Sequence, residues 1–288
     1  SSHQPRFTVR VGRIGDFGAL AACALFGHLH LVEWFLRAAD EPATVEQAAD
    51  ALATSLEWGG PTSVVELLCR RLQESGFDLN AVQCTADPGY PSLGRAHGTM
   101  ECALLGITRS ALFYARHAAG LPPGPLSEVE AVDAQKREQL SWANAAWLAS
   151  HTGARLGSKS FAKILCSYHF DPRGHDEMNS FVMQSFVLQL TKLCIEKLGA
   201  SWSDSSQQGR DERELTALQL LVNGCWMDAV QWLAKERNAP LHGLVIEVRH
   251  RFAATSDRYE PFRATLRTLQ EEQRRAWAGM GGDVTDKE

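Results

Sequence analysis

Two segments of the chain repeat the same pattern of glycine and hydrophobic residues. They read GHLHLVEWFLRAAD, beginning at Gly27, and GPTSVVELLCRRLQ, beginning at Gly60, so the two glycines lie 33 residues apart. In both segments, hydrophobic pairs follow the glycine at plus four and plus five, and further largely hydrophobic positions begin at plus seven. Glycine permits a tight turn, and this hydrophobic spacing is typical of one helix face. The repeat therefore predicts pairs of antiparallel helices.

A single pair of helices is too small to cover its own hydrophobic face, so similar pairs must stack. The 288 residues, 44% hydrophobic and 22% charged, are enough to form a continuous core. We expect an all-α fold, an α-solenoid of about six helix-turn-helix units with a C-terminal capping helix. More degenerate copies of the pattern predict second helices that begin near Gly106 and Gly157.

The repeats resemble those of the ankyrin family, whose unit of about 33 residues consists of a turn and two helices. The matching residues are Leu20, Cys23-Ala24 and Gly27-His28 in the first copy, Gly76 to Ala81 in the second, and Thr216 to Gln219 in the last. The resemblance implies that His28 forms hydrogen bonds between neighbouring units. Ala217 replaces the family's proline and Cys225-Trp226 its Gly-His pair, so a TPR-like or HEAT-like solenoid stays open as an alternative.

These repeats set the expected domain limits. We expect an N-terminal extension at 1–13, degenerate ankyrin-like repeats at 14–240, a C-terminal helical cap at 241–280 and a flexible tail at 281–288. Three helices are also predicted from their end signals, a capping box or proline at the start and glycine at the end. They run from Thr44 and Gln47 to Gly59-Gly60, from Ser127 and Glu130 to about His151 and Gly153, and onward from Pro261.

Charge and motifs disfavour several classes of function. With 29 basic and 34 acidic side chains the net charge is -5, which gives no cationic field for nucleic acid or anionic lipid. The sequence contains no phosphate-binding loop, dinucleotide fingerprint, nucleophile elbow or HExxH motif. The seven cysteines are scattered, without Cys-x-x-Cys pairs or zinc-finger spacing. We therefore expect no catalytic activity, no cofactor and no metal.

The cysteines also bear on localisation, because six of them lie in hydrophobic helical runs where a reduced thiol acts as a small hydrophobic group. This indicates an intracellular, reducing compartment, either the cytoplasm or the interior of an organelle. The hydrophobic stretch from Gly18 to Leu36 contains His28, His30 and Glu33. We interpret it as two helices of a soluble protein and not as a transmembrane segment.

Two alternative functions are open. One is an enzyme with its site around His169, His175 and Asp176, the only compact cluster of acid-base or ligand side chains. Its spacing fits no motif, and its Pro, Gly and Asp residues are typical of a solvated turn. The other is phosphate binding by the seven arginines between Glu247 and Arg275, where five acidic residues reduce the local charge to +2.

Aromatic residues indicate where a partner binds. Eight tryptophans exceed what a core of Leu, Ala and Val requires, so some should contact another protein. The candidate partner-binding residues are Phe26, Trp58, Trp147, Asn223 and Trp226, whereas Trp34 and Trp232 are assigned to packing between helices. The sequence thus predicts a non-catalytic protein-protein interaction module, an adaptor or structural subunit of a larger assembly. It would bind another protein or complex through a concave groove and hairpin tips, with self-association left open.

Overall fold

A computed structural model describes residues 8–10, 16–37, 42–81, 98–118, 128–156, 160–168, 181–207, 214–246 and 260–279. Within these ranges the chain is mostly helical, with two short antiparallel strand pairs, and this confirms the expected all-α class. The chain divides into two compact units, unit 1 at residues 1–157 and unit 2 at residues 158–288.

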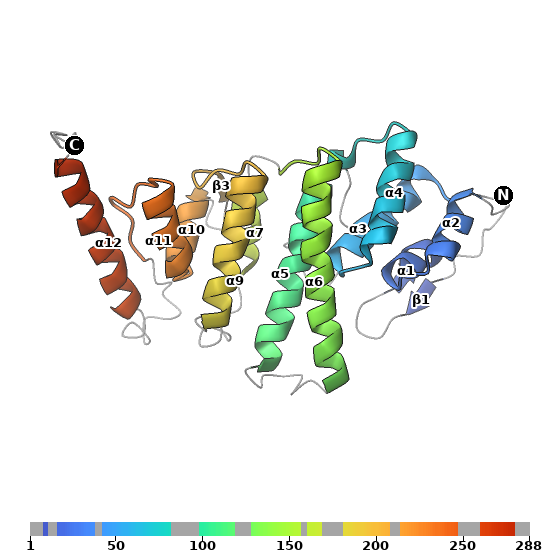
Figure 1. Ribbon diagram of the computed structural model, residues 1–288, viewed down its shortest axis with the longest axis horizontal. Coiled ribbons are helices and arrows are strands. Elements are labelled where there is room, and N and C mark those ends of the chain that lie inside the picture. The colour runs from blue at the N-terminus through green and yellow to red at the C-terminus, as the bar shows by residue number, and fades with distance from the viewer. Residues whose placement is uncertain are drawn as a thin grey trace. The chain divides into compact units, whose positions relative to one another are not determined.

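Unit 1 is built from helices that lie in pairs (Figure 1). Its elements are β1(Thr8–Arg10), β2(Asp16–Gly18), α1(Ala19–Leu25), α2(Leu29–Arg37), α3(Val45–Glu57), α4(Thr62–Glu74), η1(Leu79–Ala81), α5(Thr99–Ala118) and α6(Glu128–His151). The first helices, α1, α3 and α5, pack successively against one another, and the second helices, α2, α4 and α6, do the same. Each helix thus buries one face against its pair mate and others against the neighbouring pairs.

End signals in the sequence account for several of these helices. The Thr44 capping box is confirmed: the Gln47 amide donates to Thr44 Oγ1 at 3.3 Å and the Thr44 amide to Gln47 Oε1 at 2.9 Å. The long helix to His151 is also confirmed, and Gly153 follows it at φ +67°. Ser127, its expected cap, lies outside the described residues. The C-terminal helix begins at Glu260, one residue before the predicted start.

The α1–α2 and α3–α4 turns share one geometry. Gly27 and Gly59 both have positive φ, +76° and +69°, and the residue after each donates its amide to a carbonyl five residues earlier. Gly59, and not Gly60, is therefore the equivalent of Gly27, so the expected register is wrong by one residue. The expectation for Gly106 is also wrong, because this glycine lies inside α5 and starts no second helix. Gly157 lies outside the described residues.

Unit 2 repeats the arrangement with other elements. They are α7(Ser160–Tyr168), α9(Phe181–Lys192), a π-helical turn η3(Leu193–Lys197), β3(Ser205–Gln207), β4(Glu214–Thr216), α10(Ala217–Asn223), α11(Met227–Glu236) and α12(Glu260–Gly279). α10 packs against α7 and α11, and α11 packs against α9 and α12. The α10–α11 turn has the same geometry as the turns of unit 1, with Cys225 at φ +58°.

A short strand hairpin precedes the first helix of a pair in each unit. β1 pairs with β2, whose last residue, Gly18, directly precedes α1, and β1 lies within the expected N-terminal extension. β3 pairs with β4, whose last residue, Thr216, caps α10 by accepting the Gln219 amide at 3.1 Å. The hairpin, first helix, left-handed turn and second helix therefore occur in the same order twice along the chain.

α12 packs at the end of unit 2, within the region expected to form the cap. Leu266 and Leu269 are its buried hydrophobic residues. Two glutamines attach it to the backbone of the preceding loop: Gln270 Nε2 donates to the Leu241 and Leu244 carbonyls at 2.8 Å, and Gln273 Nε2 to the Ala239 carbonyl at 2.7 Å. Because these bonds satisfy loop carbonyls, α12 holds the loop as well as covering the end of the core.

The cores consist mainly of leucine, alanine and valine, together with four of the five cysteines whose burial the structure describes, whereas Cys23 is half-buried. Cys69, Cys102, Cys194 and Cys225 are buried free thiols. Burial raises the pKa of Cys69 and of Cys225 to about 12, so both stay protonated and unreactive at neutral pH. Among the described helices, none is both long and hydrophobic enough to cross a membrane.

Candidate partner-binding surface

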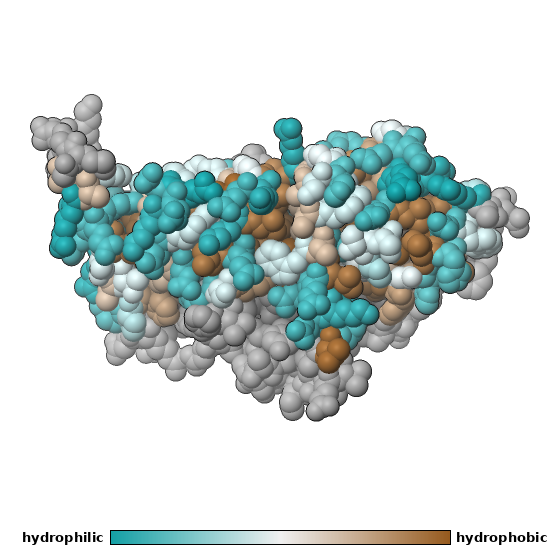
Figure 2. Space-filling view, viewed as in Figure 1, coloured by the Kyte–Doolittle hydropathy of each residue, from teal (hydrophilic) through white to brown (hydrophobic). Residues whose placement is uncertain are grey.

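Exposed hydrophobic side chains concentrate on α2 and on the turn before it. Phe26 and Trp34 are 47% and 48% exposed, and Leu29 and Leu31 are exposed as well. Seven large hydrophobic residues are exposed in the described part of the chain, and these four lie within nine residues. Figure 2 shows hydrophobic surface over helices α1–α4 of unit 1. A cluster of this kind is typical of an interaction site, whereas scattered exposed residues are not.

Two of the predicted partner-binding residues, Phe26 and Trp58, lie on neighbouring turns of unit 1. Phe26 ends α1 and Trp58 ends α3, each directly before the residue with positive φ. The turns are close, since a Cβ built on Gly27 would lie 2.7 Å from Pro61 Cγ. Phe26 is exposed and Trp58 is half-buried. We call these two residues the turn surface.

Helix α6 fixes the turn that carries Trp58. Asn144, fully buried, donates from Nδ2 to the Gly60 carbonyl at 2.9 Å and accepts from Thr62 Oγ1 at 2.7 Å. Helix α6 also approaches the turn closely, because a Cβ on Gly59 would lie 2.7 Å from the Arg137 carbonyl oxygen. The turn is therefore rigid, which lowers the entropy lost when its aromatic residue binds a partner.

Trp147, another predicted site residue, lies near the C-terminal end of α6. It is half-buried, and its ring is stacked on His151, with centroids 5.2 Å apart and planes 12° apart. The His151 ring also contacts its own helix, since Nδ1 lies 3.0 Å from the Trp147 carbonyl oxygen. This stacking partly covers the indole, so Trp147 offers less free ring surface than Phe26.

In unit 2, the two predicted site residues mainly serve packing. Trp226 is only 1% exposed and is among the largest buried side chains, so it cannot contact a partner in this conformation. Its position after Cys225 turns the ring inward against the core, and we leave it out of the candidate surface. Asn223 is half-buried and accepts a hydrogen bond from Gln219 Nε2 at 2.7 Å. Gln219 Nε2 also donates to the Val245 carbonyl at 2.9 Å, so this network joins α10 to the segment that follows α11.

The two tryptophans assigned to packing differ from each other. Trp34 is exposed, so its assignment to the core is wrong: Val32 and Leu36 form the buried face of α2, and Trp34 lies on the other side. Trp232 is half-buried, and the cationic groups of Lys192 and Arg237 lie 5.7 and 5.3 Å from its ring centre. Arg237 also forms an ion pair with Glu196 at 2.7 Å. Trp232 thus stabilises the packing of α11 on α9, and the Arg237–Glu196 ion pair adds a link to η3.

Leu29 and Leu31 were not among the predicted site residues. Helix geometry could have identified Leu31, because a buried pair at i and i+4 fixes the inner face of α2 and leaves Leu31 off it. Among the residues that the structure describes, none forms the inter-unit hydrogen bond to the His28 ring that the resemblance implies. The ring is exposed and lies edge-on to His30, with centroids 6.3 Å apart. In both units an amide side chain, Asn144 or Gln184, binds a helix-helix turn instead.

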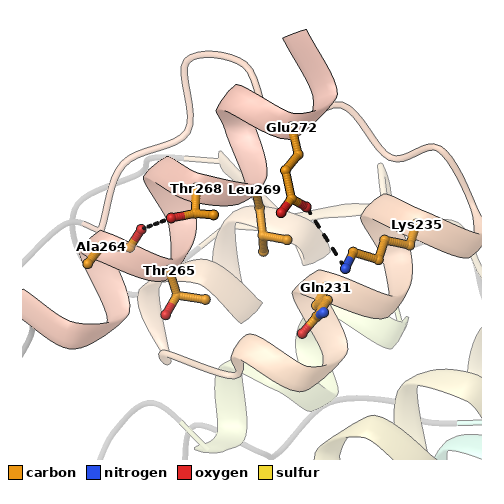
Figure 3. A pocket seen from close by; sticks show the side chains of 7 residues that line it. All are labelled: Gln231, Lys235, Ala264, Thr265, Thr268, Leu269 and Glu272. Carbon is orange, nitrogen blue, oxygen red and sulfur yellow. Dashed lines mark hydrogen bonds and ion pairs between the residues drawn. The ribbon is translucent and has the colours of Figure 1, made fainter. Parts of the chain in front are cut away.

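A shallow groove of about 320 Å³ lies between α11 and α12 (Figure 3). It is lined by Gln231, Lys235, Ala264, Thr265, Thr268, Leu269 and Glu272. Lys235 Nζ and Glu272 Oε2 face each other at 3.9 Å, and Thr268 Oγ1 donates back to the Ala264 carbonyl at 3.0 Å. Thr265 Oγ1 donates to the Pro261 carbonyl, so most polar side chains that line this groove already bond to other groups of the chain and are poorly placed to orient a small molecule.

The residues of the alternative enzyme site, His169, His175 and Asp176, lie outside the described residues, as does the start of the arginine-rich segment. Within the ranges that the structure describes, no three His, Cys, Asp or Glu side chains lie close enough to hold a metal ion. The chain matches no protein-family model, no curated protein and no solved structure.

Proposed function

We propose that this chain is a non-catalytic protein-protein interaction module, an ankyrin-like α-solenoid that serves as an adaptor or structural subunit. The repeated order of hairpin, first helix, left-handed turn and second helix supports the solenoid architecture. So does the packing of first helices on first helices and of second helices on second helices in unit 1. Stacked pairs of this kind present their turns side by side, which creates an extended surface for a protein partner.

The observation that carries this proposal is an exposed aromatic residue, Phe26, on a turn that packs beside a second turn held by Asn144. Phe26 is 47% exposed beside the half-buried Trp58, and Asn144 fixes the neighbouring backbone. Burial of an aromatic ring on a preorganised turn gives affinity without a large loss of entropy. The partner is therefore a protein that covers the Phe26 ring with hydrophobic side chains of its own. The free buried thiols support a reducing compartment for this binding.

Affinity purification from the cells that make the protein tests this function. The double variant Phe26→Ala/Trp58→Ala should lose the proteins that the unchanged chain captures, as identified by mass spectrometry. Val245→Ala/Trp277→Ala, which removes two exposed hydrophobic residues from unit 2, is the matched control and should keep them. Because Trp58 is half-buried, Phe26→Ser alone provides a second variant with less risk to folding. Full capture by both turn variants, with unchanged circular dichroism, would disprove the turn surface as the binding site.

A further inference from the structure

The outer face of α2 presents an exposed tryptophan that does not contribute to the core. Val32 and Leu36 are buried, so at about 100° per residue Trp34 lies at the centre of the opposite face. Trp34 is 48% exposed, and the Phe35 ring lies edge-on to it with centroids 5.1 Å apart. This contact restricts the indole to few orientations. Leu31, also exposed, lies on one side of Trp34.

Two opposite charges lie on the other side of Trp34. Glu33 and Arg37 are four residues apart on α2, and both are exposed. Neither forms an ion pair with any residue that the structure describes. A strongly acidic or basic partner would find one of these charges repulsive. A strip that carries one acid and one base beside a hydrophobic centre is instead complementary to its own copy in the reverse direction.

We propose that α2 pairs with α2 of a second copy of this chain, antiparallel, about a two-fold axis level with Phe35. This axis places each Glu33 opposite Arg37 of the second copy, so the same ion pair forms twice. The two Trp34 rings are then offset by about 3 Å along the helices, which allows offset stacking. α2 has only 9 residues, so the buried area is small and the dimer is transient. The contacts of this pairing use Glu33, Trp34 and Arg37, and neither Phe26 nor Trp58 of the turn surface.

Sedimentation velocity over a range of chain concentrations tests the pairing. The unchanged chain should show a reversible monomer-dimer equilibrium, and Trp34→Ser should weaken the dimer by at least about tenfold, because it removes the central anchor. Trp277→Ser, which removes another exposed tryptophan, should leave the dimer unchanged. A chain that stays monomeric at all concentrations, or a dimer that Trp34→Ser does not weaken, overturns the proposal.

Charge reversal tests the antiparallel arrangement itself. Glu33→Arg and Arg37→Glu each place like charges opposite one another at two positions, so each should weaken the dimer by about tenfold. The double variant E33R/R37E reverses both pairs and should restore dimerisation. A mixture of the two single variants should form a heterodimer, since one strip then carries two arginines and the other two glutamates. If neither the double variant nor the mixture associates better than the single variants, the antiparallel arrangement is wrong.

Discussion

The α3–α4 turn of unit 1 and the α10–α11 turn of unit 2 have the same backbone but different residues. Gly59 has φ +69° and Cys225 has φ +58°. The next amide donates five residues back in both, from Gly60 to Ser55 at 2.6 Å and from Trp226 to Leu221 at 3.0 Å. At Gly59 a Cβ would collide with the Arg137 backbone of α6, whereas the Cys225 side chain fits into the core. Glycine is therefore required by the neighbouring helix more than by the left-handed conformation.

The side chains that bind these two turns come from helices on opposite sides of the turn in sequence. Asn144 belongs to α6, which follows the α3–α4 turn in sequence, and Gln184 belongs to α9, which precedes the α10–α11 turn. Gln184 Nε2 donates to the Cys225 carbonyl at 2.8 Å, and its Oε1 accepts the Asp228 amide at 3.4 Å. Both amides thus satisfy a turn carbonyl and a neighbouring donor. Each turn requires a side-chain amide that both donates and accepts a hydrogen bond, and either a preceding or a following helix can supply it.

The largest loss of stability is expected from a substitution at Gly106, where α5 closely approaches α3. A Cβ on Gly106 would lie well inside van der Waals distance of the Leu56 carbonyl oxygen at the end of α3. Gly106→Ala should therefore destabilise the chain by about 3 kcal/mol or more in urea denaturation, although alanine is the better helix former. Ala146→Gly, at an exposed position of α6, is the control and should cost no more than about 1 kcal/mol. Equal effects of the two changes would contradict the close approach.

A comparison of Gly59 with Gly153 separates the cost of the close contact with α6 from the cost of the left-handed backbone conformation. Gly59 and Gly153 have nearly equal φ values, +69° and +67°, but a Cβ on Gly153 would meet nothing within 4 Å. Gly153→Ala should cost about 1 kcal/mol from backbone strain alone. Gly59→Ala should cost about 2–3 kcal/mol, because α6 must also move away from the turn. Equal unfolding midpoints for the two variants would show that conformation alone requires the glycine.

The turn-binding amides should come next in magnitude. Asn144→Ala leaves the buried Gly60 carbonyl without its donor and should destabilise unit 1 by about 2 kcal/mol. Gln184→Ala removes the corresponding donor from the Cys225 carbonyl and should destabilise unit 2 by a similar amount or slightly less, because its second bond is longer. Hydrogen exchange followed by mass spectrometry should locate the first effect in α3 and α4 and the second in α10 and α11. Faster exchange spread evenly over both units would contradict local turn stabilisation.

The sequence was sufficient to predict the helices whose ends carry local signals. The Thr44 capping box and the stop at Gly153 depend on residues within a few positions, so a single sequence reveals them. The register of the second repeat was missed because Gly59 and Gly60 are adjacent, and only the packing of α6 decides which of them takes the left-handed conformation. Gly106 was misinterpreted for the same reason, since its glycine serves a helix crossing and not a turn.

The candidate site was less predictable, because burial depends on neighbours that are distant in sequence. Trp34 lies within the second helix of one pair and Trp226 precedes the second helix of another, yet one is 48% exposed and the other 1% exposed. Periodicity places Trp34 on α2 but does not reveal whether another helix covers that face. Phe26 was identified from the repeat pattern, which places it near the end of a first helix, on the side that lines the groove in the family that the chain resembles.

The smallest change in stability is expected when Cys225 is replaced by glycine, the residue that unit 1 has at the equivalent turn position. Cys225→Gly relieves backbone strain of about 1 kcal/mol but removes a buried side chain of similar worth, so stability should change by less than about 1 kcal/mol. The reciprocal change, Gly59→Cys, should cost at least as much as Gly59→Ala, because its larger side chain meets the same Arg137 carbonyl. Thermal unfolding of both variants gives this asymmetry directly. If Cys225→Gly proves as harmful as Asn144→Ala, packing of the thiol, and not the backbone turn, is what residue 225 provides to unit 2.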